Sequence, residues 1–226
     1  GPALGGCRMW NYTSEKDALI DVLRLSKGMT YKAAIAGLNL GGGKAVIIGD
    51  PKADKSEELF RSFGRFIEGL GGRYITAEDV GTSIKDMDYV RMETKYVTGI
   101  SKSFGGSGDP SLLTAFGTYL GIKASVKFKL KKDSLEGLSI SVQGLGSVGM
   151  ELVKYLSNDG MKIFAYDIDE DLTAKAENKY GVTKIAPNSI YGLDVDIYAP
   201  CALGATINDE TIPKLYKTKH QSRKNQ

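Results

Sequence analysis

An alternation of strand-like and helix-like segments in the second half of the chain constrains its fold more than any other feature. Each short apolar run there is followed by a helix-like stretch, beginning with the run 138–142 and the stretch that starts near residue 147. Strands that alternate with helices in this way build a parallel sheet that is covered on both faces. We therefore expect a doubly wound α/β sheet. The four predicted strands are 138–142, 162–166, 183–186 and 195–199.

A glycine motif joins the first of these strands to its helix. Gly144, Gly146 and Gly149 have the G-x-G-x-x-G spacing that allows a tight turn and a close approach of a pyrophosphate to the helix N-terminus. Asp167 ends the next strand, where its carboxylate would accept hydrogen bonds from the adenosine ribose and repel a 2′-phosphate. The motif thus predicts a Rossmann-type dinucleotide site that favours NAD over NADP. The expected contacts are Gly144, Leu145, Gly146, Ser147, Val148, Gly149, Met150 and Asp167.

In the first half, the segment 38–51 (LNLGGGKAVIIGDP) places Lys44 directly after three glycines and before an apolar run. Glycines let the backbone approach a ligand closely, and a lysine held there can lose its solvation and its usual pKa. Lys44 is therefore a candidate acid/base. A phosphate-binding loop is disfavoured, because Ala45 stands where a hydroxyl belongs and Gly37 lies one position too early. A tight turn that feeds a buried strand remains an open alternative.

The first half mixes helices and strands, and it ends in a Gly/Ser-rich stretch, 98–110, that reads as a linker. Pro110 suits the first turn of a long helix that follows. We expect two domains: a mixed-sheet substrate-binding and catalytic domain over 1–110, and an NAD-binding domain over 111–226. The other predicted helices are 14–28, 56–70, 83–95 and 111–130, and the other predicted strands are 31–36, 45–49 and 73–77.

Composition excludes several classes of function. A net charge of +3, evenly spread, does not suit a nucleic-acid surface, and no apolar run is long enough for a membrane span. Cys7 and Cys201 lie too far apart for a disulfide framework or a zinc site, which favours a reducing cytoplasm and no metal. The single histidine, His220, sits in a polar tail, so acid/base chemistry must come from Lys, Asp, Glu or Tyr.

These motifs resemble the signature of the Glu/Leu/Phe/Val dehydrogenase family, and in particular its leucine dehydrogenase branch. The resemblance implies NAD-dependent oxidative deamination of L-leucine and other branched-chain L-amino acids to 2-oxo acids and ammonia. It also implies a homo-oligomer, which is an octamer in that family. The matching stretches are 1–10 (GPALGGCRMW), 27–44 (KGMTYKAAIAGLNLGGGK), 72–81 (GRYITAEDVG), 144–149 and 196–213 (DIYAPCALGATINDETIP).

Roles for individual residues follow from the resemblance by position. Lys44 matches the catalytic lysine, Asp79 the aspartate that handles protons at the amino group, and Lys32 the lysine that holds the substrate carboxylate. Lys44 would act as a base if Lys32 and burial both lower its pKa. The residues implied to line the substrate site are Gly5, Gly6 and Met29, and those implied to lie beside the cofactor are Thr114, Cys201, Ala202 and Asn208.

Two apolar residues, Leu4 and Ala77, favour a branched aliphatic substrate, because a glutamate-specific member would be expected to carry a cation at position 4. A phenylalanine-preferring dehydrogenase and a non-catalytic nucleotide-binding fragment are the alternatives. Individual residues also have simpler interpretations: Asp79 as a turn cap, Lys32 as a solvated strand lysine, and Cys201 as an inert thiol.

The resemblance weakens near the end of the chain. Family members continue beyond Leu215 with a buried strand and an asparagine-rich turn, whereas residues 217–226 are polar and Asn225 is a poor match to that turn. We therefore expect a fragment of a longer protein, truncated at both ends, that is unstable or weakly active by itself.

Overall fold

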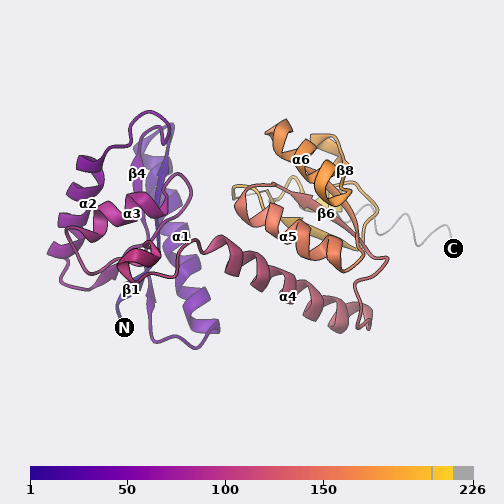
Figure 1. Cartoon of the computed structure of the whole chain (residues 1–226), viewed down its shortest axis with the longest axis horizontal. Coiled ribbons are helices and arrows are strands. Elements are labelled where there is room, and N and C mark those ends of the chain that lie inside the picture. The colour runs from indigo at the N-terminus through magenta and orange to yellow at the C-terminus, as the bar shows by residue number, and fades with distance from the viewer. Residues whose placement is uncertain (205, 216–226) are drawn as a thin grey trace. The chain divides into compact units, whose positions relative to one another are not determined.

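The computed structural model describes residues 1–204 and 206–215. The polar tail 217–226, with His220 and Asn225, lies outside the described residues. The chain divides into two compact units, Gly1–Pro110 and a second unit that begins at Ser111. Figure 1 shows the elements of each unit, which are described separately below.

In the first unit, every strand pair among the described residues is parallel, where a mixed sheet was expected. The strands form a three-stranded set in the order β3-β1-β5 and a two-stranded set of β2 and β4. Helix α1 packs on β3 and β4, and α2 packs on α3. The elements are β1 (Ala3–Leu4), β2 (Cys7–Trp10), α1 (Glu15–Ile35), β3 (Gly41–Gly42), β4 (Ala45–Ile48), α2 (Glu57–Gly69), β5 (Tyr74–Ile75), α3 (Ile84–Arg91) and the 3-10 turn η1 (Lys102–Phe104).

Helix α1 corrects two predictions, because it runs through Gly28 and includes residues 31–35, which were expected to form a strand. A glycine inside a helix costs only about 1 kcal/mol relative to alanine, and packing easily outweighs this cost. The packing here is close: a Cβ built on Gly42 would lie 2.2 Å from the backbone nitrogen of Thr30. The predicted start of the helix is confirmed, since the Ser14 hydroxyl accepts a hydrogen bond from the backbone N–H of Asp17 at 3.1 Å.

The core of the first unit lies between its strands and the pair α2 and α3. Four of its side chains are fully buried and come from β2, α2 and α3, so the strands and the two helices share one apolar cluster. The cluster consists of Met9, Phe60, Met87, Val90, Val97 and Ile100.

The second unit is the predicted doubly wound α/β sheet, which confirms the fold class. Its four strands are parallel in the order β8-β7-β6-β9, so the chain starts in the middle and changes direction between β6 and β9. Helices α4 and α5 run side by side. The elements are α4 (Ser111–Leu130), β6 (Ser139–Gln143), α5 (Ser147–Asn158), β7 (Lys162–Tyr166), α6 (Glu170–Tyr180), β8 (Thr183–Lys184), the 3-10 turn η2 (Pro187–Ser189) and β9 (Ile197–Pro200).

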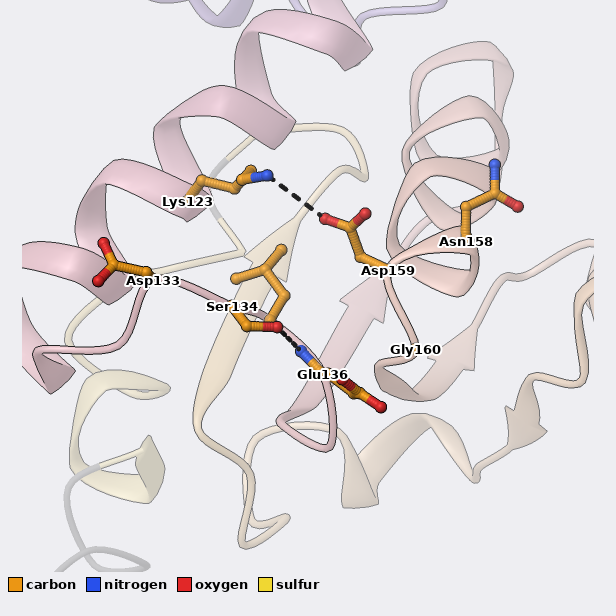
Figure 2. A pocket seen from close by; sticks show the side chains of 8 residues that line it. Lys123, Asp133, Ser134, Glu136, Asn158, Asp159 and Gly160 are labelled. Carbon is orange, nitrogen blue, oxygen red and sulfur yellow. Dashed lines mark hydrogen bonds and ion pairs between the residues drawn. The ribbon is translucent and has the colours of Figure 1, made fainter.

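A pocket of about 310 Å³ opens in the second unit between Lys123 of α4, residues 133–136 before β6, and residues 158–160 before β7. Figure 2 shows the Lys123 amino group directed at the carboxylate of Asp159, 3.8 Å away. These segments precede their strands, whereas the glycine motif follows β6. The pocket therefore lies at the amino ends of the parallel strands, and the predicted cofactor site lies at their carboxyl ends.

No helix among the described residues is long and apolar enough to cross a membrane.

Candidate active site

Lys44 lies at a break between β3 and β4, and its side chain is only 6% exposed. Its Nζ lies 3.1 Å from Oδ1 of Asp79. Burial lowers the pKa of Lys44 from its ordinary value, the carboxylate of Asp79 opposes this, and the charges of Arg8 and Lys32 lower it further. The side chain thus meets the condition stated for a base: burial and Lys32 both favour its neutral form.

Three backbone segments close around Lys44, and glycines allow them to do so. A Cβ on Gly5 would lie 1.8 Å from the carbonyl oxygen of Gly43, and a Cβ on Gly6 would lie 2.2 Å from that of Glu78. Neither distance is possible for a real Cβ, so both positions require glycine as the backbone stands. Gly5 and Gly6 therefore allow one backbone segment to pack directly on another beside Lys44.

Asp79 is fixed at both its backbone and its side chain. Its backbone N–H donates to the Thr82 hydroxyl at 2.9 Å, and that hydroxyl donates to the carbonyl oxygen of Cys7. The carboxylate receives Arg8 Nε on Oδ2 at 2.7 Å and faces Lys44 with Oδ1. The turn at this point is held by backbone and Thr82 groups, so the Asp79 carboxylate is directed to two cations instead of capping the turn.

Arg8 is a site residue that sequence reasoning missed. Its Nη1 also contacts Oδ2 of Asp21 at 3.0 Å, and Asp21 accepts a hydrogen bond from the Tyr12 hydroxyl at 2.6 Å. No local signal identified it, because Arg8 alternates with the buried residues Cys7 and Met9 along β2, and a charged residue on the other face of a strand is ordinarily solvated.

The residues predicted to bind substrate gather near Lys44, although Lys32 stands on α1 rather than on a strand. Met29 is three residues before Lys32, on the same side of α1, and its Cγ lies 3.2 Å from a Cβ built on Gly5. Leu4 ends β1 and is half-buried, as is Ala77 in the neighbouring segment. The chain is paired there, since the N–H of Cys7 donates to the carbonyl oxygen of Ala77 at 2.7 Å.

The glycine motif forms a cradle at the carboxyl end of β6. Gly144 has φ of +95°, and a Cβ there would lie 2.6 Å from the backbone nitrogen of Ala202. A Cβ on Gly149 would lie 2.0 Å from the carbonyl oxygen of Gly144 and 3.4 Å from the Cβ of Cys201. The motif and the segment after β9 therefore flank the point where the strand order reverses, which is the ligand crevice of such sheets.

Gly146, the central glycine, differs from Gly144 and Gly149 because, apart from its chain neighbours, no atom of the described residues lies within 4 Å of a Cβ built on it. It precedes α5, which begins at Ser147 and continues through Val148, Gly149 and Met150. The N-terminus of α5 thus opens onto free space beside a glycine. This geometry fits the diphosphate of a dinucleotide.

Asp167 follows β7 and reaches the glycine motif. Its Oδ2 accepts the N–H of Leu145 at 2.5 Å, and its Oδ1 accepts the N–H of Asp169 at 2.8 Å. Each carboxylate oxygen can accept a further hydrogen bond, so ribose hydroxyls can still be bound.

Thr114, Asn208 and Cys201, which the resemblance implies to lie beside the cofactor, have different local roles in the structure. Thr114 lies in the first turns of α4. The side-chain oxygen of Asn208 accepts the N–H groups of Glu210 and Thr211 at 3.0 Å, which holds a turn. Burial raises the pKa of Cys201 to about 11, which agrees with the inert thiol considered above.

Known proteins resemble this chain along nearly its whole length. Residues 1–96 match the family described as Glu/Leu/Phe/Val dehydrogenase, dimerisation domain. Leucine dehydrogenase of Geobacillus stearothermophilus is 59% identical over 215 residues, which are 95% of this chain and 59% of that protein. Phenylalanine dehydrogenase of Bacillus thermotolerans is 48% identical over 220 residues, which are 95% of this chain and 58% of that protein.

A solved structure of another amino-acid dehydrogenase is also similar to this chain. The crystal structure of L-tryptophan dehydrogenase from Nostoc punctiforme has a TM-score of 0.71 at 44% identity, covering 95% of this chain and 61% of that one. The chain thus spans about three fifths of the length of the curated relatives it matches. The resemblance that the motifs predicted is confirmed: residues 1–96 match the Glu/Leu/Phe/Val dehydrogenase family, and 95% of this chain is similar to a leucine dehydrogenase.

Proposed function

We propose that the protein carrying this chain is an NAD-dependent amino-acid dehydrogenase that converts L-leucine and other branched-chain L-amino acids to 2-oxo acids and ammonia. The observation that carries the proposal is the buried pair of Lys44 and Asp79, with Nζ 3.1 Å from Oδ1 and with the pKa of Lys44 lowered by burial. A buried lysine that readily gives up its proton is suited to general base catalysis near neutral pH.

The three predicted side chains have distinct tasks in this reaction. The Lys32 ammonium would hold the substrate carboxylate and so fix the position of the α-carbon. When bound, the nicotinamide accepts the hydride of the α-carbon, and the substrate becomes an imine. Lys44 would then take a proton from the water that adds to the imine, and Asp79 would pass a proton to the amino group before ammonia departs.

The diphosphate and ribose of NAD would be held by the second unit. The open N-terminus of α5 beside Gly146 supports the diphosphate position, and the carboxylate of Asp167 supports NAD over NADP because a 2′-phosphate would face its negative charge. Leu145, Ser147, Val148 and Met150 are kept as cofactor contacts on the glycine motif, and Thr114, Cys201, Ala202 and Asn208 on the family resemblance.

Leucine is preferred over phenylalanine as the proposed substrate for two reasons. The leucine dehydrogenase relative is 59% identical, against 48% for the phenylalanine dehydrogenase. Leu4 and Ala77 add an apolar character to the expected side-chain pocket. Since an apolar pocket separates aliphatic homologues by only about 1–3 kcal/mol per methylene, valine and isoleucine should also react.

The test is NADH formation by the purified protein with leucine, valine, isoleucine and phenylalanine, together with NAD titration by calorimetry. A higher kcat/KM for leucine than for phenylalanine supports the proposal, and the reverse order favours the phenylalanine alternative. NAD binding without turnover of any of the four would refute the proposed substrates and favour the non-catalytic nucleotide-binding alternative.

Two further proposals accompany the activity. Assembly into a homo-oligomer is supported by the match of residues 1–96 to a dimerisation domain. A reducing, cytoplasmic location rests on the wide separation of Cys7 and Cys201 in the sequence.

A further inference from the structure

Arg8 holds two carboxylates at once from its place on β2. Its Nε donates to Oδ2 of Asp79 at 2.7 Å, and its Nη1 donates to Oδ2 of Asp21 on α1 at 3.0 Å. Asp21 is held in turn by the Tyr12 hydroxyl at 2.6 Å. The Arg8 side chain is only 16% exposed. Burial lowers the pKa of Arg8, but the hydrogen bonds and charges of Asp79 and Asp21 together more than offset this, so the pKa is raised and Arg8 stays charged.

The contact with Arg8 divides the Asp79 carboxylate into two differently occupied oxygens. Oδ2 belongs to the guanidinium, and Oδ1 faces Lys44 at 3.1 Å. A carboxylate without a second cation can rotate and give both oxygens to a nearby ammonium. Arg8 opposes this rotation, because its Nε occupies Oδ2 of Asp79 while its Nη1 is anchored on Asp21, so the planar guanidinium is held in place.

We propose that Arg8 is a positioning residue for the acid/base pair: it restrains Asp79 so that a single carboxylate oxygen faces Lys44. The proposal rests on the proposed function only for calling the pair catalytic, since the restraint itself is a matter of geometry.

The charged and titratable groups around Lys44 set the expected direction of the effect. Asp79 raises the pKa of Lys44, whereas Arg8 and Lys32 lower it. The neighbouring Cys7 is a neutral thiol below alkaline pH, because burial raises its pKa to about 12. Loss of Arg8 should raise the pKa of Lys44 in two ways, since a positive charge is removed and Asp79 becomes free to offer Lys44 both oxygens.

The experiment measures the pKa of Lys44 directly in the full chain. Lysine side chains are labelled with ¹³C at Cε, the Lys44 signal is assigned as the one missing from K44R, and its chemical shift is followed against pH. In R8M the pKa of Lys44 should rise by about one unit or more. In R8K, which keeps the charge but lacks the fork, the rise should be smaller. R61M removes a surface arginine that pairs with Glu93 and should leave the pKa unchanged.

A merely structural brace gives a different result. It would lower the stability of the R8M and R8K variants without moving the pKa of Lys44, and this outcome would overturn the proposal. If R8M does not fold, R8K decides by itself: a measurable rise supports the restraint and an unchanged pKa refutes it.

The dehydrogenase assay separates this inference from the proposed function. In an active protein, the acidic limb of the kcat/KM profile, where activity is lost as Lys44 becomes protonated, should move to higher pH in R8M by the same interval as the pKa of Lys44. If the wild-type protein lacks dehydrogenase activity and the pKa of Lys44 still rises in R8M, the proposed function is refuted and the role of Arg8 stands.

Discussion

Replacement of Asp79 by asparagine should destabilise the first unit in a way that depends on pH. In the D79N variant, Lys44 loses its only described carboxylate partner, and Arg8 keeps Asp21 alone. Breaking a buried ion pair on one side costs about 3–5 kcal/mol. Because the Asp79 side chain is 22% exposed, we take the lower end, about 3 kcal/mol at pH 7.

The pH dependence follows from the direction of the pKa change. Asp79 raises the pKa of Lys44, so the pKa of Lys44 in folded D79N lies further below the ordinary value of 10.5 than in the wild type. Between that lowered pKa and 10.5, the unfolded chain binds more protons than the folded one, and stability rises with pH. Each pH unit between the Lys44 pKa of D79N and that of the wild type returns about 1.4 kcal/mol of the loss. The difference between D79N and the wild type should therefore shrink from pH 7 to pH 9.

The assay is urea unfolding followed by fluorescence of Trp10, the single tryptophan, which lies on β2 and reports the first unit alone. E93Q is the matched control, because Glu93 is also partly buried but pairs with two exposed arginines, Arg61 and Arg65, so its replacement should cause a smaller loss that does not vary with pH. The reasoning is refuted if D79N loses no more stability than E93Q, or if its loss is equal at pH 7 and pH 9.

Three further changes have defined outcomes. Burial raises the pKa of Cys7 from 9.0 to about 12, so above pH 9 the unfolded chain loses the thiol proton before the folded one does. The free energy of unfolding of the wild type, measured in urea, should therefore fall by about 2 kcal/mol relative to that of C7A between pH 8 and pH 10.5. An equal pH dependence of the free energy of unfolding in the two proteins would contradict this. The G146A variant should keep the Tm of the wild type but bind NAD about tenfold more weakly or worse, as measured by calorimetry. The G149A variant should also have a lower Tm, because its added Cβ would lie 2.0 Å from a carbonyl oxygen. Normal NAD binding by G146A would show that the diphosphate does not bind beside Gly146. K32M should raise the KM for leucine about 10- to 100-fold with NAD affinity unchanged, and an unaltered KM would take the carboxylate away from Lys32.

The second unit could be predicted closely from the sequence, since each of its elements is marked locally. Strand 162–166 was found as predicted, and the strand expected at 138–142 is shifted by one residue. Apolar runs of strand length are separated by a glycine motif and by helix caps such as Asp169, and these signals all indicate the same alternation. The site residues of this unit could therefore be placed on their loops in advance.

The first unit was harder to predict, because its decisive contacts join residues that are distant in the sequence. Gly28 looked like the end of a helix, but the close packing of α1 on Gly42 continues the helix to Ile35. That packing also places Lys32 on a helix. The partnership of Arg8 with Asp79 and Asp21 depends on the parallel closure of three segments, which no local pattern specifies.

The most direct test of the account is the pair of measurements on K44A, namely turnover of leucine and binding of NAD. The lysine and the cofactor cradle lie in different units, so the two properties should separate. We expect kcat to fall by about 100-fold or more, as for loss of a general base, while the NAD dissociation constant stays within about twofold of the wild-type value. Unchanged turnover in K44A would contradict the central claim that Lys44 is the catalytic base.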